Sequence, residues 1–291
     1  MPTATALTLY DAMNGIHVNS TAPYFARHPD AEYTIERFSL YCTVISALEW
    51  RRMNGAIFMV TDSIAAGFYR RNGLDKVWDS VLELIPDDMD GIDPEIFWAG
   101  GKLIALRDIP QNAALVDEDL IIWKTLTLSD TAVTAMHREN LSPDIYPDPM
   151  LFGVTDFPLL RRLDMSILPC NTAFLYIPDD SFRLFYANQS IAFMKSASKN
   201  KCGDRLCRMV FAEQRLLAML CEMTGTNIET LMDMNKLFIS QDSYTHLWGA
   251  KQAMRDAPAQ REGFIDRCRR RIESDFPEYS YISEAIDECT E

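Results

Sequence analysis

Apolar positions along the chain follow two different patterns, one with the period of a helix and one without gaps. Residues 36–53 are predicted to form a helix, because their apolar side chains recur near one helical face. Residues 56–60 are instead an unbroken apolar run, bounded by Asn54-Gly55 and by Thr61-Asp62. Such a run is typical of a strand buried on both faces in a parallel sheet.

The same patterns recur along the rest of the chain. Further helices are expected over residues 63–72, 97–106, 181–198, 211–224 and 255–273. Further strands are expected over residues 5–10, 113–123 and 173–177, with irregular segments at 20–33 and 138–160. Strands that alternate with helices predict an α/β fold, in which helices flank a mostly parallel, Rossmann-like sheet. We expect residues 1–251 to form this domain and residues 252–291 to form a helical extension packed on it.

Charge excludes two classes of partner. The 291 residues include 28 Lys and Arg against 42 Asp and Glu, which gives a formal net charge of -14. Nonspecific binding to nucleic acid or to an anionic membrane needs clustered cations, so neither is expected. An anionic substrate remains compatible, because a bound metal ion or a local Lys reverses the field inside one cleft.

Cysteine usage and the N-terminal residues bear on location. The seven cysteines are an odd number at low density, which is typical of reduced thiols rather than a disulfide scaffold. The first residues show no basic segment followed by an apolar stretch, and no run approaches the roughly 20 apolar residues of a membrane span. We therefore expect a cytoplasmic protein without a membrane span, and delivery into another cell stays open.

Three acidic residues, Asp117, Glu118 and Asp119, interrupt the apolar run at 113–123. Successive side chains on a strand point to opposite faces, so we expect Asp117 and Asp119 to share a face and Glu118 to point away. Two neighbouring carboxylates in apolar surroundings need a counter-charge, and a divalent cation is the usual one. The alternative is a solvated turn between two short strands.

The surroundings of this triplet resemble the DxD region of GT-A glycosyltransferases, in particular the retaining glycogenin and lipopolysaccharide-galactosyltransferase type. Matching features occur in the family's order over residues 102–251. Lys102 lies fifteen residues before Asp117, about where the family has a basic residue. Residues 171–178 resemble the family's N-x-G-x-x-x-x-P segment, and Glu213-Gln214 stands where the family has Asp-Gln. Residues 244–251 resemble the family's H-x-x-G-x-x-K motif. The chain departs from the pattern with Ala173 for Gly, Glu213 for Asp, and Lys251 one residue nearer to Gly249.

The resemblance implies a GT-A-like fold and a role for each matched residue. Asp117, Asp119 and His246 are expected to ligate Mn²⁺ or Mg²⁺, while Glu118 faces away and tolerates change. Expected donor contacts come from Thr61, Asp62, Lys102, Gly249 and Lys251. Asn171, Glu213 and Gln214 are expected to act at the reacting sugar, with Glu213 near the anomeric carbon. For Thr61-Asp62 the alternative is a cap on the next helix, and for Glu213-Gln214 it is a pair at a helix N-terminus.

The function implied is that of a metal-dependent glycosyltransferase, which moves a sugar from a UDP-linked donor to an acceptor with retention. The acceptor is a sugar, a peptide or a small molecule, and its specificity is expected to lie in residues 138–160 and 252–291. One alternative is a protein that binds a nucleotide sugar without turning it over. Another is a metal-dependent nucleotidyltransferase, but the Gly-rich phosphate loop expected for that class is absent from the sequence.

Overall fold

The computed structural model describes residues 13–109, 112–154, 156–200, 203–236, 239 and 241–290. The strand expected over residues 5–10 lies outside the described residues. Among the described helices, none is long and apolar enough to cross a membrane.

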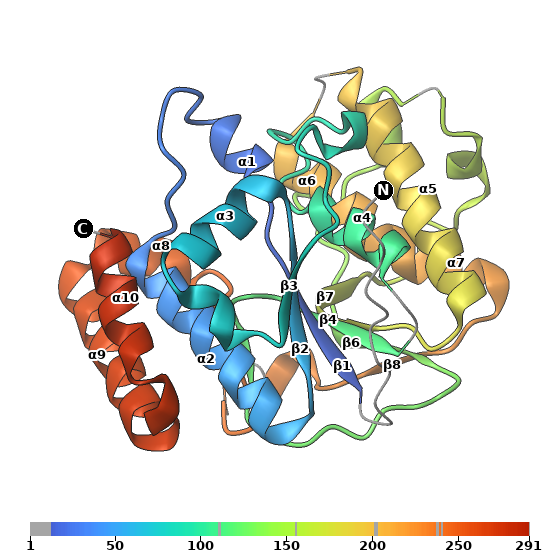
Figure 1. Cartoon of the computed structure of the whole chain (residues 1–291). Helices are drawn as coiled ribbons and strands as arrows, with labels where there is room; N and C mark the ends of the chain where they lie inside the picture. The colour runs from blue at the N-terminus through green and yellow to red at the C-terminus, as the bar shows by residue number, and fades with distance from the viewer. Residues whose placement is uncertain are drawn as a thin grey trace.

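The described residues form a seven-stranded sheet at the centre of the molecule, with strand order β3-β2-β1-β4-β7-β6-β8 (Figure 1). Strands β3, β2, β1 and β4 are parallel, β7 is antiparallel to both β4 and β6, and β8 is parallel to β6. The expected α/β fold with a mostly parallel sheet is therefore confirmed. The strands of this sheet are β1 (Asn14–Val18), β2 (Ile57–Thr61), β3 (Ser80–Glu83), β4 (Ala113–Val116), β6 (Val133–Arg138), β7 (Cys170–Tyr176) and β8 (Ile228–Thr230).

Strand β1 lies between β2 and β4, and the hydrophobic pattern did not predict it. Its polar members interrupt the apolar run, yet Asn14 and His17 are both buried. The His17 ring pairs through Nε2 with the Ser46 hydroxyl at 3.1 Å and accepts at Nδ1 from Trp78 Nε1 at 3.2 Å. Residues distant in sequence thus form the hydrogen bonds of the buried ring. The local hydrophobic pattern therefore does not predict this strand.

The apolar run at 113–123 was predicted as one strand, and this prediction is wrong. It divides into β4 and a separate strand, β5 (Leu120–Ile122), which pairs with β9 (Tyr244–His246) in a small antiparallel sheet. The acidic triplet forms the turn between β4 and β5, where Leu120 N–H donates to the Asp117 carbonyl at 2.9 Å. The two halves of the run therefore belong to different sheets.

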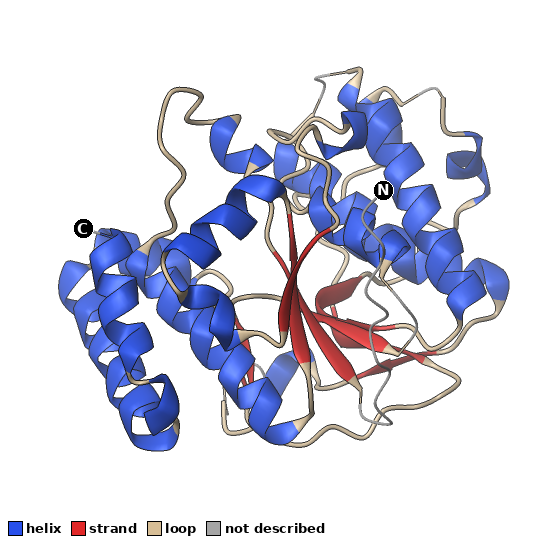
Figure 2. Cartoon of the chain, viewed as in Figure 1, coloured by secondary structure: helices blue, strands red, loops and turns tan. Residues whose placement is uncertain are grey.

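Helices cover both faces of the central sheet (Figure 2). Strand residues alternate between two cores: Val60 and Leu115 face the core shared with α4, α5 and α7, whereas Met59 and Val116 face the core shared with α2 and α3. The helices are α1 (Ala22–Phe25), α2 (Arg37–Met53), α3 (Ser63–Arg71), α4 (Gly100–Asp108), α5 (Asp180–Ser198), α6 (Arg205–Val210), α7 (Leu216–Thr224), α8 (Ala250–Asp256), α9 (Pro258–Asp275) and α10 (Tyr281–Thr290).

The last two helices pack beside α2, on the side of the molecule away from α5 (Figure 1). Ile272 and Ile282 are buried in the same core as α2, and the Tyr41 hydroxyl on α2 donates to the Ser283 carbonyl at 3.2 Å. The C-terminal segment is thus helical, as expected. The boundary at residue 251 stays a prediction.

Candidate metal centre and active-site cavity

A cavity of about 510 Å³ opens where the parallel strands β1 and β4 end. Asn19 follows β1 and the acidic triplet follows β4, so both reach the carboxyl edge of the sheet. Open α/β sheets bind ligands at this edge, because loops from neighbouring strands converge there. The π-helical turn Phe211–Arg215, which joins α6 to α7, contributes Glu213 and Gln214 to the cavity wall.

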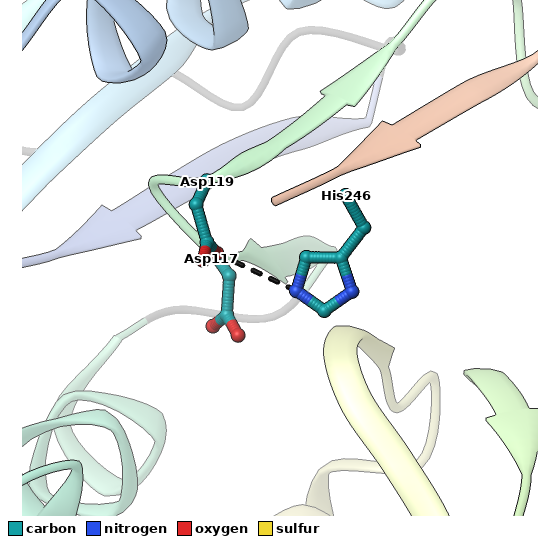
Figure 3. A group of neighbouring side chains, drawn as sticks. All are labelled: Asp117, Asp119 and His246. Atoms are coloured by element: carbon teal, nitrogen blue, oxygen red, sulfur yellow. Dashed lines mark ion pairs between the residues drawn. The ribbon is translucent and has the colours of Figure 1, made fainter. Parts of the chain in front are cut away.

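Asp117 and Asp119 from the turn between β4 and β5, and His246 from the end of β9, converge on one point of this cavity (Figure 3). One potential ligand atom from each lies within 4.8 Å of the others, and His246 Nε2 is 3.5 Å from Asp119 Oδ1. The small sheet holds His246 close to the acidic turn, because Leu120 on β5 pairs with His246 on β9. The grouping expected from the sequence is therefore present as a possible metal site.

The donor atoms of this group fit a divalent cation. The His246 side chain is only 4% exposed, and its Nε2 is the ring nitrogen that faces Asp119 (Figure 3). A neutral imidazole nitrogen beside two carboxylates is a common ligand set for a divalent metal ion. Two carboxylates and one imidazole suit Mn²⁺ and Mg²⁺, and the arrangement does not distinguish them.

Two lysines already pair with the two aspartates. Lys102 Nζ lies 2.6 Å from Asp117 Oδ1, contacts Glu213, and donates to the Thr172 carbonyl at 3.0 Å. Lys251 Nζ lies 2.9 Å from Asp119 Oδ2. Burial lowers the pKa of both lysines, but the facing carboxylates outweigh it and raise each pKa above its usual value. Both ammonium groups therefore stay charged at neutral pH.

The two aspartates respond differently to their surroundings. Burial raises the pKa of Asp117, and repulsion from Asp119 and Glu213 adds to the rise against the opposing effect of Lys102. Burial also acts to raise the pKa of Asp119, yet the hydrogen bond from His246 and the charge of Lys251 hold that pKa well below its usual value. Asp119 is thus the more firmly ionised of the two.

The three residues expected at the reacting sugar also line the cavity, and two of them share a partly buried hydrogen-bond network. Asn171 Nδ2 donates to Glu139 at 2.9 Å, the Tyr146 hydroxyl donates to the same carboxylate at 2.5 Å, and Gln214 Oε1 lies 2.6 Å from that hydroxyl. Glu213 is 7% exposed. The Pro-rich segment at 138–160 therefore supports the cavity wall through Glu139 and Tyr146.

Glu118 was expected to point away from the site, and this orientation is wrong. Because the triplet forms a turn rather than a strand, the alternation of faces does not apply, and Glu118 lines the same cavity as its two neighbours. Asn19 Nδ2 donates to its two oxygens at 3.4 and 3.3 Å, and the Tyr69 hydroxyl lies at 3.4 Å. Burial raises the pKa of Glu118 to about 7, against the opposing hydrogen bond from Asn19.

Three of the residues expected to contact the donor lie outside the cavity wall. Thr61 and Asp62 are fully buried. Asp62 caps α3 by accepting from Ala65 N–H at 3.0 Å, and its other oxygen accepts from Thr21 N–H at 2.5 Å. Gly249 precedes α8 in the left-handed region, with φ 74°. These residues shape the chain around the cavity, whereas direct contact with a nucleotide stays a prediction.

Several cavity residues were not assigned a role from the sequence. Asn19 was missed because strand β1 was missed. Trp98 and Trp248 carry no sequence signal that separates them from the large aromatic residues of a core. Both rings line the cavity, whereas the Trp123 indole lies under Arg271. Further lining residues without a prior signal are Ser20, Tyr24, Arg27, His28, Thr172, Leu206 and Met209.

Comparison with known proteins gives structural likeness only. No family profile matches the chain, and no curated protein matches its sequence. Among solved structures, the galactosyltransferase LgtC in complex with donor and acceptor sugar analogues aligns at a TM-score of 0.44 and 10% identity, over 74% of this chain and 73% of that one. The glycosyltransferase GlyE of Streptococcus pneumoniae aligns at a TM-score of 0.38 and 11% identity, over 76% of this chain and 46% of that one. Mouse xyloside xylosyltransferase 1 aligns at a TM-score of 0.36 and 10% identity, over 75% and 84%. The chain is thus structurally similar to these glycosyltransferases at low sequence identity.

Proposed function

We propose that this protein is a metal-dependent glycosyltransferase that takes its sugar from a nucleoside diphosphate sugar, with UDP as the expected nucleotide and retention as the expected outcome. The observation that carries the proposal is the convergence of Asp117, Asp119 and His246 on one cavity, with ligand atoms within 4.8 Å of one another. The sequence resemblance to GT-A enzymes supports it independently.

The charge of the cavity wall supports a diphosphate ligand held through a metal ion. Among the described residues, four carboxylates line the cavity, against three Lys and Arg side chains, Arg27, Lys102 and Lys251. Above about pH 7, where Glu118 is ionised, the wall therefore carries one negative charge in excess and repels an anion. One divalent cation reverses that sign, after which a diphosphate is attracted. The bound metal supplies electrostatic stabilisation of the departing diphosphate.

The chain's own residues divide the remaining tasks. Lys251 holds Asp119 in place and adds positive charge beside the proposed phosphate position. Lys102 and the Thr172 hydroxyl both bind Glu213, the latter at 2.8 Å, which fixes the position of that carboxylate. A carboxylate fixed in this way is suited to stabilise the positive charge that develops at an anomeric carbon. Asn171 and Gln214 are held by Glu139 and Tyr146 and supply hydrogen bonds to sugar hydroxyls.

The test is a panel of nucleotide sugars, measured by thermal shift and by release of nucleoside diphosphate, each with and without Mn²⁺. We expect one donor to stabilise the protein only when Mn²⁺ is present, by about 2.7 kcal/mol at a hundredfold excess over Kd. Slow metal-dependent hydrolysis of the same donor is expected to accompany this shift. Asp119→Ala should abolish both, whereas Glu273→Gln, at an exposed position on α9, should change neither.

Two results would count against the proposal in different ways. Donor binding without hydrolysis or transfer, under conditions that saturate the site, would favour the alternative of a protein that holds a nucleotide sugar without turning it over. The complete lack of any metal-dependent shift across the panel would contradict a nucleotide-sugar site altogether.

A further inference from the structure

A second hollow adjoins the active-site cavity, between α6 and the segment that follows α1 (Figure 1). This outer hollow has a volume of about 470 Å³ and is lined by Arg27, Trp98, Asp204, Arg205 and Leu206. Arg27, Trp98 and Leu206 line the main cavity as well, so the two spaces share a wall. No residue of the acidic turn lines the outer hollow, and the proposed metal centre therefore does not account for it.

The charge of the outer hollow is opposite to that of the whole protein. Among the described residues, two arginines line it against one aspartate, in a chain whose formal net charge is -14. The Asp204 carboxylate is already engaged, because it caps α6 by accepting from Leu206 N–H at 2.7 Å and from Cys207 N–H at 3.3 Å. Arg205 pairs with the exposed Glu95 at 3.4 Å, a contact that solvent screens. The outer hollow therefore attracts an anion without the help of a metal ion.

Arg27 is the cation of the outer hollow that no acidic side chain neutralises. It lies on the exposed segment after α1, and among the described residues its guanidinium forms no hydrogen bond or ion pair. A guanidinium binds a carboxylate through two parallel N–H···O bonds, which makes arginine well suited to recognise this group. Because Arg27 belongs to the shared wall, an anion bound to it can be part of a ligand that also enters the main cavity.

The α6 helix leads from the outer hollow to the residues expected at the reacting sugar. Leu206, Met209, Val210 and Glu213 all line the main cavity, at the spacing of one helical face. Leu206 and Glu213 are seven positions apart, which corresponds to about 10 Å along a helix. This span is longer than one sugar ring. A carbohydrate that reaches both ends therefore contains at least two sugar units.

The apolar side chains of the outer hollow suit a sugar ring. Trp98 lies two residues before α4 and is half-buried, and Leu206 is 42% exposed. The face of an indole is a flat apolar surface against which the C–H groups of a sugar ring can pack. With Arg27 at the same wall, the outer hollow combines a surface for a ring with a cation for a negatively charged substituent.

We infer that the acceptor is an acidic oligosaccharide, with one unit near Glu213 and the carboxylate of another unit bound by Arg27 in the outer hollow. This inference rests on the proposed function and names the class of acceptor that the cavity takes. Trp98 packs against the ring that carries the carboxylate. Acceptor recognition then lies on α6 and on the segment after α1, rather than in residues 138–160 and 252–291, where the sequence led us to expect it.

The experiment probes an array of neutral and acidic oligosaccharides with the labelled protein, in saturating Mn²⁺ and the nucleoside diphosphate that binds most tightly. We expect the bound glycans to carry a carboxylate. The strongest is then compared by calorimetry with its carboxyl-reduced form, in which a hydroxymethyl group replaces the carboxylate. Hydrogen bonds between charged groups predict a preference of ~10-fold or more for the acid. In Arg27→Gln this preference should fall below about threefold, and Arg27→Lys should be intermediate, since it keeps the charge without the planar fork.

A matched variant controls for the loss of one positive charge. Arg270 is exposed on α9 and lines neither space, so Arg270→Gln should keep the unmodified preference for the acid. The affinity of each variant for the nucleoside diphosphate is measured in parallel, and thermal unfolding shows whether each variant is folded. If Arg27→Gln weakens nucleoside diphosphate binding as strongly as it weakens binding of the acidic glycan, Arg27 serves the donor and the inference is overturned.

The remaining outcomes separate the two proposals. If a nucleoside diphosphate binds with Mn²⁺ but the bound glycans are neutral, or no glycan binds, the acidic acceptor is overturned and the proposed function stands. The same conclusion follows if folded Arg27→Gln keeps the full preference for the acid. If no nucleoside diphosphate binds with Mn²⁺, both proposals fail together.

Discussion

The ammonium nitrogen of Lys102 lies 2.6 Å from Asp117 and also contacts Glu213, so one cation joins two carboxylates that come from different elements. The Lys102 side chain is only 12% exposed. Because the pair is largely buried, removing the cation leaves two carboxylates close together in a poorly solvated space. Lys102 therefore acts as the counter-ion of the site when no metal is bound.

Lys102→Met should lower the free energy of unfolding by about 3 kcal/mol, since it leaves buried charge without its partner. It should also raise the affinity for Mn²⁺, because the metal replaces the missing positive charge. Urea unfolding with and without Mn²⁺ measures both effects. Lys76→Met removes a lysine whose side chain is 70% exposed and should cost less than about 1 kcal/mol. Equal losses in the two variants would contradict the role of Lys102.

Asp62 should prove important for stability. Asp62→Ala removes the cap of α3 and leaves the buried Thr21 N–H without its acceptor, for a combined cost of about 3 kcal/mol in unfolding free energy. Asp179 caps α5 through a single bond to Phe182 N–H, so Asp179→Ala should cost about 1 kcal/mol. Chemical denaturation of the two variants gives the comparison. A smaller loss for Asp62→Ala than for Asp179→Ala would show that the second contact contributes nothing.

The buried His17 predicts a loss of stability in mild acid. Burial lowers its pKa to about 3, whereas an unfolded histidine titrates near 6.5. Between these values the unfolded chain binds the additional proton, so the free energy of unfolding falls as pH drops below about 6.5, by up to ~1.4 kcal/mol per pH unit. Urea unfolding at pH 7 and pH 5 should therefore show a shallower pH dependence in His17→Gln. The exposed His28 provides the control, since His28→Gln should keep the original slope.

Two glycines should respond to alanine in opposite directions. A Cβ atom on Gly15 would lie 2.6 Å from the Trp50 ring, which is enclosed in the core and has little room to move, so Gly15→Ala should cost about 3 kcal/mol. On Gly67, within α3, a Cβ would meet only the end of the Arg71 side chain at 3.2 Å. Gly67→Ala should therefore stabilise the protein by about 0.5 kcal/mol through helix propensity. Thermal unfolding of both variants decides the signs.

Elements with local signals were predictable from the sequence. The unbroken apolar run at β2 is a buried parallel strand, and α2 begins within one residue of the predicted start. Strand β1 could not be predicted in the same way, because the partners that satisfy His17 lie 29 and 61 residues away. Likewise, nothing local indicates that β5 leaves the central sheet for β9.

The positions of site residues were predicted correctly where a sequence motif carried them. The prediction failed where the orientation of a side chain depends on the path of the backbone. Asp117, Asp119 and His246 converge as the resemblance implied. Glu118 was misplaced because its orientation depends on a turn that the sequence presents as continuous strand. Thr61 and Asp62 lie at the expected strand end, but their side chains are enclosed by the start of α3 and by the segment after β1.

Because β5 pairs with β9, the candidate metal group is complete only when the chain extends as far as β9. Two of its residues are translated early and sit on the main sheet's edge, whereas the third arrives with β9, whose only described strand partner is β5. A nascent or proteolysed chain that stops before Tyr244 keeps both aspartates but has neither the imidazole nor the strand that positions it. A chain cut before β9 therefore retains the acidic turn without a complete candidate metal group.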